Sequence, residues 1–240
     1  MTENDTTQSR ETERNEREHT SRFRLALAPG KILIIGTMGS GKTTLAGRLA
    51  RDTGFLSESI DACRIRYGDG TTAGEELAWD QFLKACRSQE SVILEFSGCG
   101  PHVEEVRDNL RSSGMRVSIL WLAIPLESCI ARSLQREQDV PYPYLWVPVE
   151  DAVPAFDYAL SIAWEKVWCR VPGFQVMKFA FPGTAPASEI SAVTRNVFMA
   201  LHNGNACSGI GREGGRKRSR RTRKHASAGQ RKRVGQRDGS

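Results

Sequence analysis

Gly36-Thr37-Met38-Gly39-Ser40-Gly41-Lys42-Thr43 matches the phosphate-binding pattern G-x-x-x-x-G-K-[ST] at every fixed position. Glycines in this pattern let the backbone curl, so that successive N–H groups point inward at phosphate oxygens. A lysine in the position of Lys42 supplies positive charge to the β- and γ-phosphates, and the Thr43 hydroxyl is placed to ligate Mg²⁺. The stretch therefore predicts a site for a nucleoside triphosphate and its Mg²⁺.

The residues on either side of this loop have the character that the pattern requires. Lys31–Ile35 is a short apolar run typical of a buried strand. Thr44–Ala50 continues as a helix with two leucines, four residues apart, on one face. The loop then lies at a helix N-terminus, where the helix dipole favours anions. We expect the loop, together with Thr44, to bind the nucleotide.

Changes in composition divide the chain into three parts. Residues 1–22 are charged and polar, with almost nothing apolar, which is typical of disorder. Residues 205–240 are rich in glycine, serine, arginine and lysine, and they also lack core-forming side chains. We expect one folded domain over residues 23–204, between a disordered N-terminal tail and a disordered basic C-terminal arm.

Positive charge is concentrated in the arm. Residues 207–240 hold twelve Lys and Arg against two acids, a net +10, which leaves −4 for residues 1–206 out of a total of +6. A basic arm on an acidic body is typical of polyanion binding, so DNA or another nucleic acid is the expected partner. A solubilising tail or a nuclear localisation signal would have a similar composition.

Cysteine spacing and hydropathy exclude other classes of protein. The six cysteines are scattered without a C-x-x-C pair, so a metal knuckle is not expected. No apolar run of about 18 residues is present that could cross a bilayer, and residues 1–22 lack the apolar core of a signal peptide. We therefore expect a cytoplasmic protein with reduced thiols and no membrane partner, in the host cytoplasm if a phage encodes it.

Strand-like and helix-like segments alternate through the body, which predicts an α/β fold with a parallel sheet covered on both faces. In such sheets ligands bind at the carboxyl ends of the strands, where the phosphate loop, Asp61 and Glu95 all fall. Further strands are expected at 55–60, 91–96, 116–123 and 174–179, and helices at 73–89, 101–113, 126–138 and 150–169, followed by a closing helix with Ile190, Val193, Val197 and Leu201 on one stripe.

The body, over about residues 30–203, resembles the small P-loop kinases, a group that includes shikimate, gluconate and adenylate kinases, zeta-type toxins and 5′-hydroxyl polynucleotide kinases. The phosphate loop carries most of this resemblance, and three weaker features agree in order and spacing. The resemblance implies a three-layer P-loop NTPase fold, like that of the nucleoside-monophosphate kinases, with a small helical lid. It also implies an enzyme that uses ATP and Mg²⁺ to phosphorylate an alcohol group.

The first of these features is a D-x-x-R sequence, Asp61 to Arg64, after the second predicted strand. In polynucleotide kinases, which this sequence resembles, the aspartate accepts the proton of the acceptor hydroxyl and the arginine holds an acceptor phosphate. A hydroxyl that attacks a γ-phosphate needs a carboxylate within hydrogen-bond reach. The resemblance thus implies a catalytic base at Asp61 and a substrate-binding role for Arg64. A surface turn with an ion pair is the alternative.

The second feature is the pair Arg132 and Arg136, whose spacing predicts two guanidinium groups on one helix face. In the resembling kinases such a pair opens the lid and clamps the ATP phosphates. Together with Lys42 they would lower the barrier by placing positive charge at the transferred phosphoryl group. A solvated helix face is the alternative, because acidic residues lie close by in the sequence.

The third feature is Glu95, an acid that ends an apolar strand. This is the place of a Walker-B-type carboxylate, which would hold a water of Mg²⁺. Glu95 could equally contact the acceptor, so a metal role and a substrate role both stay open.

Aromatic residues have two possible uses. Tyr142, Tyr144 and Trp146 in the lid region could stack nucleobases or pack the lid onto the body. Trp164 and Trp168, four residues apart on a predicted helix, are expected in the core.

The stretch S-I-D-A-C-R-I-R-Y-G-D-G-T-T-A-G-E-E, residues 59–76, resembles the phage P-loop kinases that phosphorylate 5-hydroxymethyluracil in DNA. This resemblance implies the leading hypothesis, a kinase that transfers the γ-phosphate of ATP to a hydroxyl on a nucleic acid as a DNA-modification step. The alternatives are a polynucleotide 5′-hydroxyl kinase, a kinase for a small molecule such as a nucleoside, nucleotide or sugar, and an NTP-gated nucleic-acid-binding protein that is no kinase.

Overall fold

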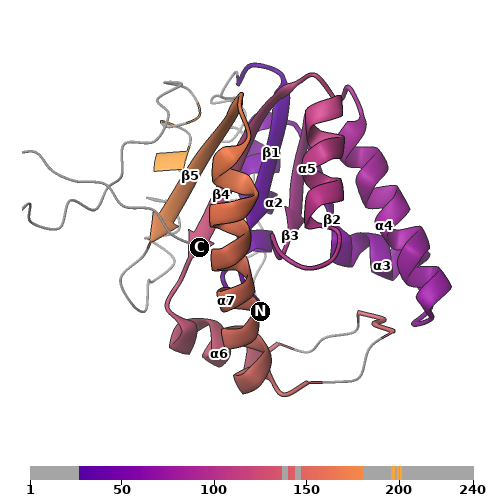
Figure 1. Ribbon diagram of the computed structural model, residues 1–240, viewed down its shortest axis with the longest axis vertical. Helices are drawn as coiled ribbons and strands as arrows, with labels where there is room; N and C mark the ends of the chain where they lie inside the picture. The colour runs from indigo at the N-terminus through magenta and orange to yellow at the C-terminus, as the bar shows by residue number, and fades with distance from the viewer. Residues whose placement is uncertain are drawn as a thin grey trace, which may run out of the picture. The chain divides into compact units, whose positions relative to one another are not determined.

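A computed structural model describes residues 27–136, 140–143, 147–180, 196–197, 199 and 201 (Figure 1). The chain divides into two units, Met1–Ser208 and Gly209–Ser240, and all described residues belong to the first. The predicted tails, residues 1–22 and 205–240, lie outside the described residues and stay predictions.

A single sheet of five parallel strands, in the order β2-β3-β1-β4-β5, organises the described residues. The prediction of a parallel sheet is confirmed. Helices lie between successive strands, and Figure 1 shows α5 and α7 in front of the sheet. The strands are β1 Gly30–Ile35, β2 Leu56–Ser59, β3 Val92–Phe96, β4 Arg116–Ala123 and β5 Phe174–Ala180; the helices are α2 Lys42–Thr53, α3 Ile60–Tyr67, α4 Thr72–Arg87, α5 Val103–Ser112, α6 Leu126–Leu134 and α7 Val149–Lys166, with the 3₁₀-helix η1 Trp168–Arg170.

Strand β1 lies in the middle of the sheet and is buried along its whole length. Its side chains alternate between two cores, as the two-residue period of a strand requires. Leu33 and Ile35 belong to the core that includes α4, α5 and α7, whereas Ile32 and Ile34 belong to the core that includes α2. The buried strand predicted at this place is confirmed, and it carries the phosphate loop at its carboxyl end.

The two predicted core tryptophans are buried. Trp164 is 8% exposed and Trp168 is fully buried, and both belong to the core on the α7 side. On the other side, Val197 and Leu201 of the predicted closing helix are buried against β1, β4 and α2 residues. The other two residues of that predicted stripe lie outside the described residues.

The largest departure from the predicted elements is helix α3, where no element was predicted and a surface turn was only an alternative. The Ser59 side chain accepts a hydrogen bond from the Ala62 N–H at 3.0 Å and so caps this helix. The predicted strand 55–60 therefore ends one residue early, and Asp61 lies in the first turn of a helix. A serine followed by an apolar residue and an acid is a start signal that sequence reading could have used.

Between α6 and α7 the structure describes residues 135–136, 140–143 and 147–148, and none of these is helical. The helical character predicted for the lid therefore stays a prediction. None of the helices in the described ranges has the length and apolarity that a membrane crossing needs.

The loop after β3 packs directly beneath the phosphate loop. The Gly36 N–H donates to the Ser97 carbonyl at 3.3 Å, and the Trp168 Nε1–H donates to the Gly98 carbonyl at 2.8 Å. Gly98 has φ +87°, and a Cβ there would lie 2.6 Å from Ile35 Cβ and 2.7 Å from Leu160 Cδ1. The close approach of this loop to the core therefore requires glycine.

We expect Gly98→Ala to lower the free energy of unfolding by about 3 kcal/mol, because it combines backbone strain with overpacking. Gly100→Ala is the control: its φ of +102° brings the same kind of strain, but no atom lies within 4 Å of the added Cβ. We expect the control to cost about 1 kcal/mol. Urea denaturation measures both, and equal losses would contradict the packing argument.

Candidate active site

The phosphate loop joins β1 to α2 and depends on two glycines with left-handed backbone. Gly39 has φ +71° and Gly41 has φ +91°. A Cβ at Gly39 would lie 2.2 Å from the Cys129 carbonyl oxygen of α6, so no side chain fits there. The loop therefore has the curled form that the sequence predicts, and it is pressed against α6.

Contacts from outside the loop hold its first half in place. The Thr37 hydroxyl donates to the Val153 carbonyl of α7 at 3.3 Å in a buried contact. The Thr37 carbonyl accepts from the Ser40 N–H at 3.3 Å and from Lys42 Nζ at 3.0 Å. Thr37 thus links the loop to α7 and to the lysine.

Lys42, the first residue of α2, is half-buried. Burial lowers the pKa of the Lys42 ammonium, and the negative charges of Glu95 and Asp61 oppose that shift. The two carboxylates therefore lie close enough to act on the lysine. The structure thus brings together three of the predicted site residues, from three different elements.

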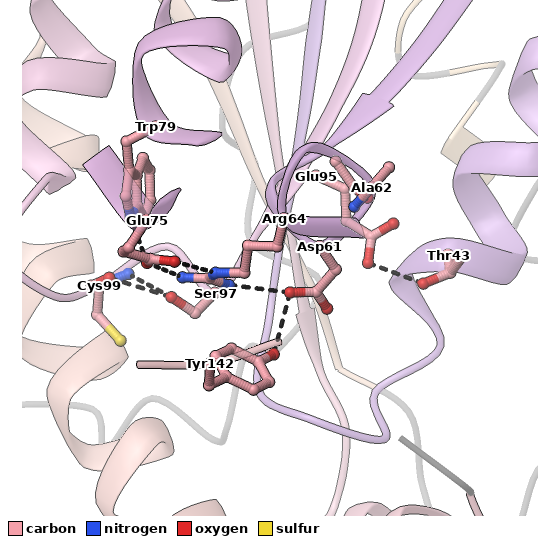
Figure 2. Close-up of polar contacts among 11 residues, drawn as sticks. Thr43, Asp61, Ala62, Arg64, Glu75, Trp79, Glu95, Ser97, Cys99 and Tyr142 are labelled. Atoms are coloured by element: carbon pink, nitrogen blue, oxygen red, sulfur yellow. Dashed lines mark hydrogen bonds and ion pairs between the residues drawn. The ribbon is translucent and has the colours of Figure 1, made fainter. Parts of the chain in front are cut away.

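Thr43 and Glu95 meet at the carboxyl end of β3. The Thr43 hydroxyl donates to Glu95 Oε1 at 2.9 Å, and Glu95 is 8% exposed (Figure 2). Burial raises the pKa of the Glu95 carboxyl, while the charge of Lys42 and the Thr43 hydrogen bond oppose the shift.

This hydroxyl–carboxylate pair fits Mg²⁺, which prefers oxygen ligands and keeps several of its waters. No cluster of three or more His, Cys, Asp or Glu side chains that could hold a metal occurs among the described residues. Mg²⁺ in nucleotide sites is usually held through one or two carboxylates and the phosphates of the substrate. Thr43 and Glu95 would hold Mg²⁺, either directly or through its waters.

Asp61 lies in the first turn of α3, on the side of Glu95 that faces away from Thr43 (Figure 2). Asp61 Oδ1 accepts hydrogen bonds from Arg64 Nη1 at 2.9 Å and from the Tyr142 hydroxyl at 3.1 Å. Figure 2 shows Asp61 between this pair and the Thr43–Glu95 contact. The Asp61 side chain is 37% exposed, so a molecule from solvent can reach it.

Arg64 is buried and held by a second carboxylate. Its Nε donates to Glu75 Oε2 at 2.8 Å and its Nη2 to Glu75 Oε1 at 2.5 Å, while Trp79 Nε1 donates to the same Oε1 at 2.8 Å. Burial opposes ionisation of Glu75, but the hydrogen bonds and charge of Arg64 outweigh it and lower the pKa of Glu75. The role predicted for Arg64, binding an acceptor phosphate, stays a prediction, and its guanidinium already has two carboxylate partners.

Tyr142 packs the segment after α6 onto the body, which is one of the two uses left open for it. Its ring centre lies 4.7 Å from the Arg64 guanidinium carbon. Burial raises the pKa of the Tyr142 hydroxyl, so the hydroxyl stays protonated. It therefore donates a hydrogen bond to Asp61. Tyr144 and Trp146 lie outside the described residues.

Sequence reasoning missed Glu75 and Trp79, and it did not assign Tyr142 to Asp61. The spacing of Glu75 and Trp79, four residues apart, places them on one face of α4 and was the available signal. The contact of Tyr142 with Asp61 joins residues 81 positions apart, and no local pattern encodes it.

The two predicted arginines lie near the phosphate loop, in different settings. Arg132 on α6 donates from Nη1 to the Gly39 carbonyl at 3.4 Å. Helix α6 ends at Leu134, so the prediction that Arg136 shares a helix face with Arg132 is wrong. Arg136 is exposed; its charge adds to the lowering of the Lys42 pKa, which burial dominates, and opposes the burial that raises the pKa of Glu95.

A separate hollow of about 390 Å³ opens at the β4–β5 side of the sheet. Lys178 Nζ lies 3.7 Å from the ring centre of Trp121 in its wall. None of the predicted site residues lines this hollow, whose walls are Trp121, Ala123, Ile124, Pro125, Leu126, Asp157, Ser161 and Lys178.

Comparison with known proteins finds partial similarity to a family model and to one curated protein. A family model described as an AAA domain matches residues 32–143, a little under half of the chain. The shikimate kinase of Moorella thermoacetica is 27% identical over 118 residues, covering 44% of this chain and 64% of that protein. The chain therefore matches less than two thirds of the length of this curated relative.

Solved shikimate kinases have the same fold. The enzyme from Acinetobacter baumannii in complex with shikimate superposes with a TM-score of 0.54 at 17% identity, covering 77% of this chain and 98% of that chain. The enzyme from Bacteroides thetaiotaomicron gives 0.50 at 19% identity, covering 73% and 99%. The predicted fold, that of the P-loop nucleoside-monophosphate kinases, is confirmed.

At 17% and 19% identity the solved structures show the fold alone, so the predicted phosphotransferase activity with ATP and Mg²⁺ is taken up below as a proposal. They do not support the predicted likeness to phage kinases that modify DNA, because the named relatives are kinases of a small molecule. The predicted site residues have not been tested by these similarities, and their roles stay predictions.

The buried pair of Arg64 and Glu75 gives a stability prediction. We expect Glu75→Ala to lower the free energy of unfolding by about 3–5 kcal/mol, because it leaves a buried guanidinium without its main partner. Replacing both residues by methionine should cost much less. Because Arg64 lowers the pKa of Glu75, the pair stabilises the fold above the ordinary glutamate pKa and loses this effect as the pH falls below it.

Urea denaturation at several pH values measures these changes. The control is Glu76→Ala, at the exposed neighbour of Glu75, which should change stability by no more than about 0.5 kcal/mol. Equal losses in the two alanine variants would show that the pair does not stabilise the fold.

Proposed function

We propose that this chain is an ATP-dependent, Mg²⁺-requiring kinase that phosphorylates an alcohol group of a small molecule. The observation that carries the proposal is the position of Asp61, a partly exposed carboxylate that lies beside the Thr43–Glu95 contact of the phosphate loop (Figure 2). A base beside the phosphate loop is what transfer to a hydroxyl requires. The fold shared with shikimate kinases supports the same class of reaction.

The donor side is built from the phosphate loop and three cations. Backbone N–H groups of residues 36–43 would bind the β- and γ-phosphates, and Lys42 would add its positive charge. Arg132 and Arg136 add positive charge from α6 and the segment after it. Mg²⁺, held at Thr43 and Glu95, would supply further neutralisation of the triphosphate. The protein thus stabilises the charge of the transition state mainly by electrostatics.

The acceptor side is built around Asp61. The contacts from Arg64 and Tyr142 both use Oδ1, which leaves Oδ2 for the acceptor hydroxyl among the described residues. The acceptor oxygen bonds to the γ-phosphorus as the bond from that phosphorus to the β,γ-bridging oxygen breaks. The electron pair of the broken bond leaves with ADP, and the hydroxyl proton passes to Asp61 and then to solvent.

We expect Asp61→Asn to lower kcat by about 10²–10⁴-fold, because the amide cannot accept the proton. Binding of ATP should be nearly unchanged, since Asp61 lies on the acceptor side. Transfer of ³²P from γ-labelled ATP to a panel of alcohols measures the first quantity, and equilibrium titration with a fluorescent ATP analogue measures the second.

Asp108→Asn is the control, since this exposed acid on α5 pairs only with its own helix neighbour Arg107 in the described contacts. It should leave both quantities unchanged. Undiminished phosphate transfer by the Asp61→Asn variant would contradict the proposal that Asp61 is the catalytic base.

A second candidate acceptor, a hydroxyl on a nucleic acid, is favoured by the charge of the basic arm. Residues 207–240 carry a net +10 and could hold a phosphate backbone near the site. Within this candidate, 5-hydroxymethyluracil in DNA comes first and a polynucleotide 5′-hydroxyl second. A stacked base would have to leave the duplex to reach Asp61.

We expect removal of residues 207–240 to abolish most salt-dependent binding to duplex DNA. If the arm engages Z phosphates, the logarithm of affinity should fall with the logarithm of salt with a slope of about −0.9Z. Fluorescence anisotropy across a salt series measures the slope in the full chain and in the truncated one.

The same two proteins, assayed with γ-labelled ATP, separate the candidates. A small-molecule kinase keeps its activity without the arm, whereas a kinase of nucleic acids loses transfer to DNA. An unchanged salt slope in the truncated chain would show that the arm does not bind DNA. Release of phosphate to water without labelling of any acceptor would favour an NTP-gated binding protein.

A further inference from the structure

We infer that the acceptor alcohol carries no anionic group at the part that enters the site, so that it is neither a carboxylic acid nor a phosphate ester. This inference rests on the proposed kinase function and narrows its substrate class. It stands on the charges around Asp61, which are set by named contacts and by the sequence of the segments that surround the site.

The buried arginine beside Asp61 is already neutralised. Arg64 gives two hydrogen bonds to Glu75 and one to Asp61, at 2.5–2.9 Å. Two carboxylates thus face one guanidinium, and the cluster carries a net charge of −1. The Tyr142 ring also covers Arg64, with its centre 4.7 Å from the guanidinium carbon. An incoming anion would have to displace a carboxylate from a buried bidentate pair, which is costly.

The other arginine of α3 is neutralised in the same way. Arg66 forms an ion pair with Glu58, which lies at the end of β2. The two cations of α3 therefore both have carboxylate partners from this part of the protein. Neither is left to bind an acidic substrate.

The segments around this side of the site add no further Lys or Arg. The sequence holds none in residues 67–83, which lead through the first turns of α4, or in residues 88–106, which include β3 and its loop. It holds none in residues 137–165 either, which include Tyr142. The His102 ring stacks on Trp79, and its Nδ1 lies 2.7 Å from Glu105 Oε2.

Positive charge is instead found on the donor side, at Lys42, Arg132 and Arg136, where the triphosphate needs it. Among the described residues, the site is thus divided into a cationic donor half and an acceptor half with a net negative charge. Shikimate, found in one of the structures with this fold, carries a carboxylate. The acceptor half of this chain therefore selects a different kind of alcohol.

The experiment uses alcohols in charge-matched sets. The compounds are sugars, cyclitols, nucleosides and short polyols, each in a neutral, an amino, a carboxylate and a phosphate form. Shikimate and a 5′-hydroxyl oligonucleotide are tested alongside them. The assay measures ³²P transfer from γ-labelled ATP by the full chain. We expect kcat/KM for the neutral or amino member of the accepted set to exceed that of its acidic members by about 100-fold. Preference for an acidic member would overturn the inference and leave the kinase proposal standing, whereas no labelling of any alcohol would overturn the kinase proposal itself.

Two substitutions test whether charge is the cause. Glu75→Gln gives the cluster one more positive charge, so kcat/KM for the acidic member should rise by about 10-fold relative to kcat/KM for the neutral member. The double variant Arg64→Gln/Glu75→Gln restores the wild-type net charge and should restore the discrimination. Circular dichroism and thermal melting verify that each variant folds.

If Glu75→Gln does not fold, Glu58→Gln provides the same test, because it releases the charge of the half-exposed Arg66. Unchanged discrimination in the folded single variant would overturn the electrostatic explanation.

Discussion

The burial of β1 on both faces is the constraint on which the rest of the structure depends. Hydrogen bonds to β3 and β4 and two separate cores hold this strand, so its carboxyl end is fixed in position. The phosphate loop begins where β1 ends, and Glu95 ends the strand beside it. The meeting of Thr43 with Glu95 follows from the parallel register of these two strands. A rigid centre of the sheet thus determines where the donor phosphates lie.

The acceptor side is held by a different kind of interaction. Asp61 begins a helix that follows an edge strand, and it is positioned by Arg64 and Tyr142 more than by the sheet. Glu75 and Trp79 fix Arg64 in turn, from a neighbouring helix. A chain of buried polar contacts orients the carboxylate, and such a chain is stable only while every member keeps its partner. Donor and acceptor halves therefore differ in how they are built as well as in their charge.

Local pattern was enough to predict the parallel sheet, the phosphate loop and the places of Asp61 and Glu95, because each follows from a strand, its end or a fixed motif. Arg132 was placed on a helix by its spacing, and that helix is observed. The end of α6 before Arg136 was not predictable in the same way, since no proline or glycine marks it. The partnership of Arg64 with Glu75 was also missed, because the intervening turn brings α3 and α4 together in a way that spacing does not encode. The contact of Tyr142 depends on the path of the chain after α6.

The tight packing of Gly39 against Cys129 has a mechanical consequence. Helix α6 cannot approach the loop further without collision, and Arg132 of the same helix holds a loop carbonyl. The chain that leaves α6 reaches Asp61 through Tyr142 within a few residues. Cys129 and Tyr142, which lie close together in the sequence, therefore limit the phosphate loop on one side and hold Asp61 on the other.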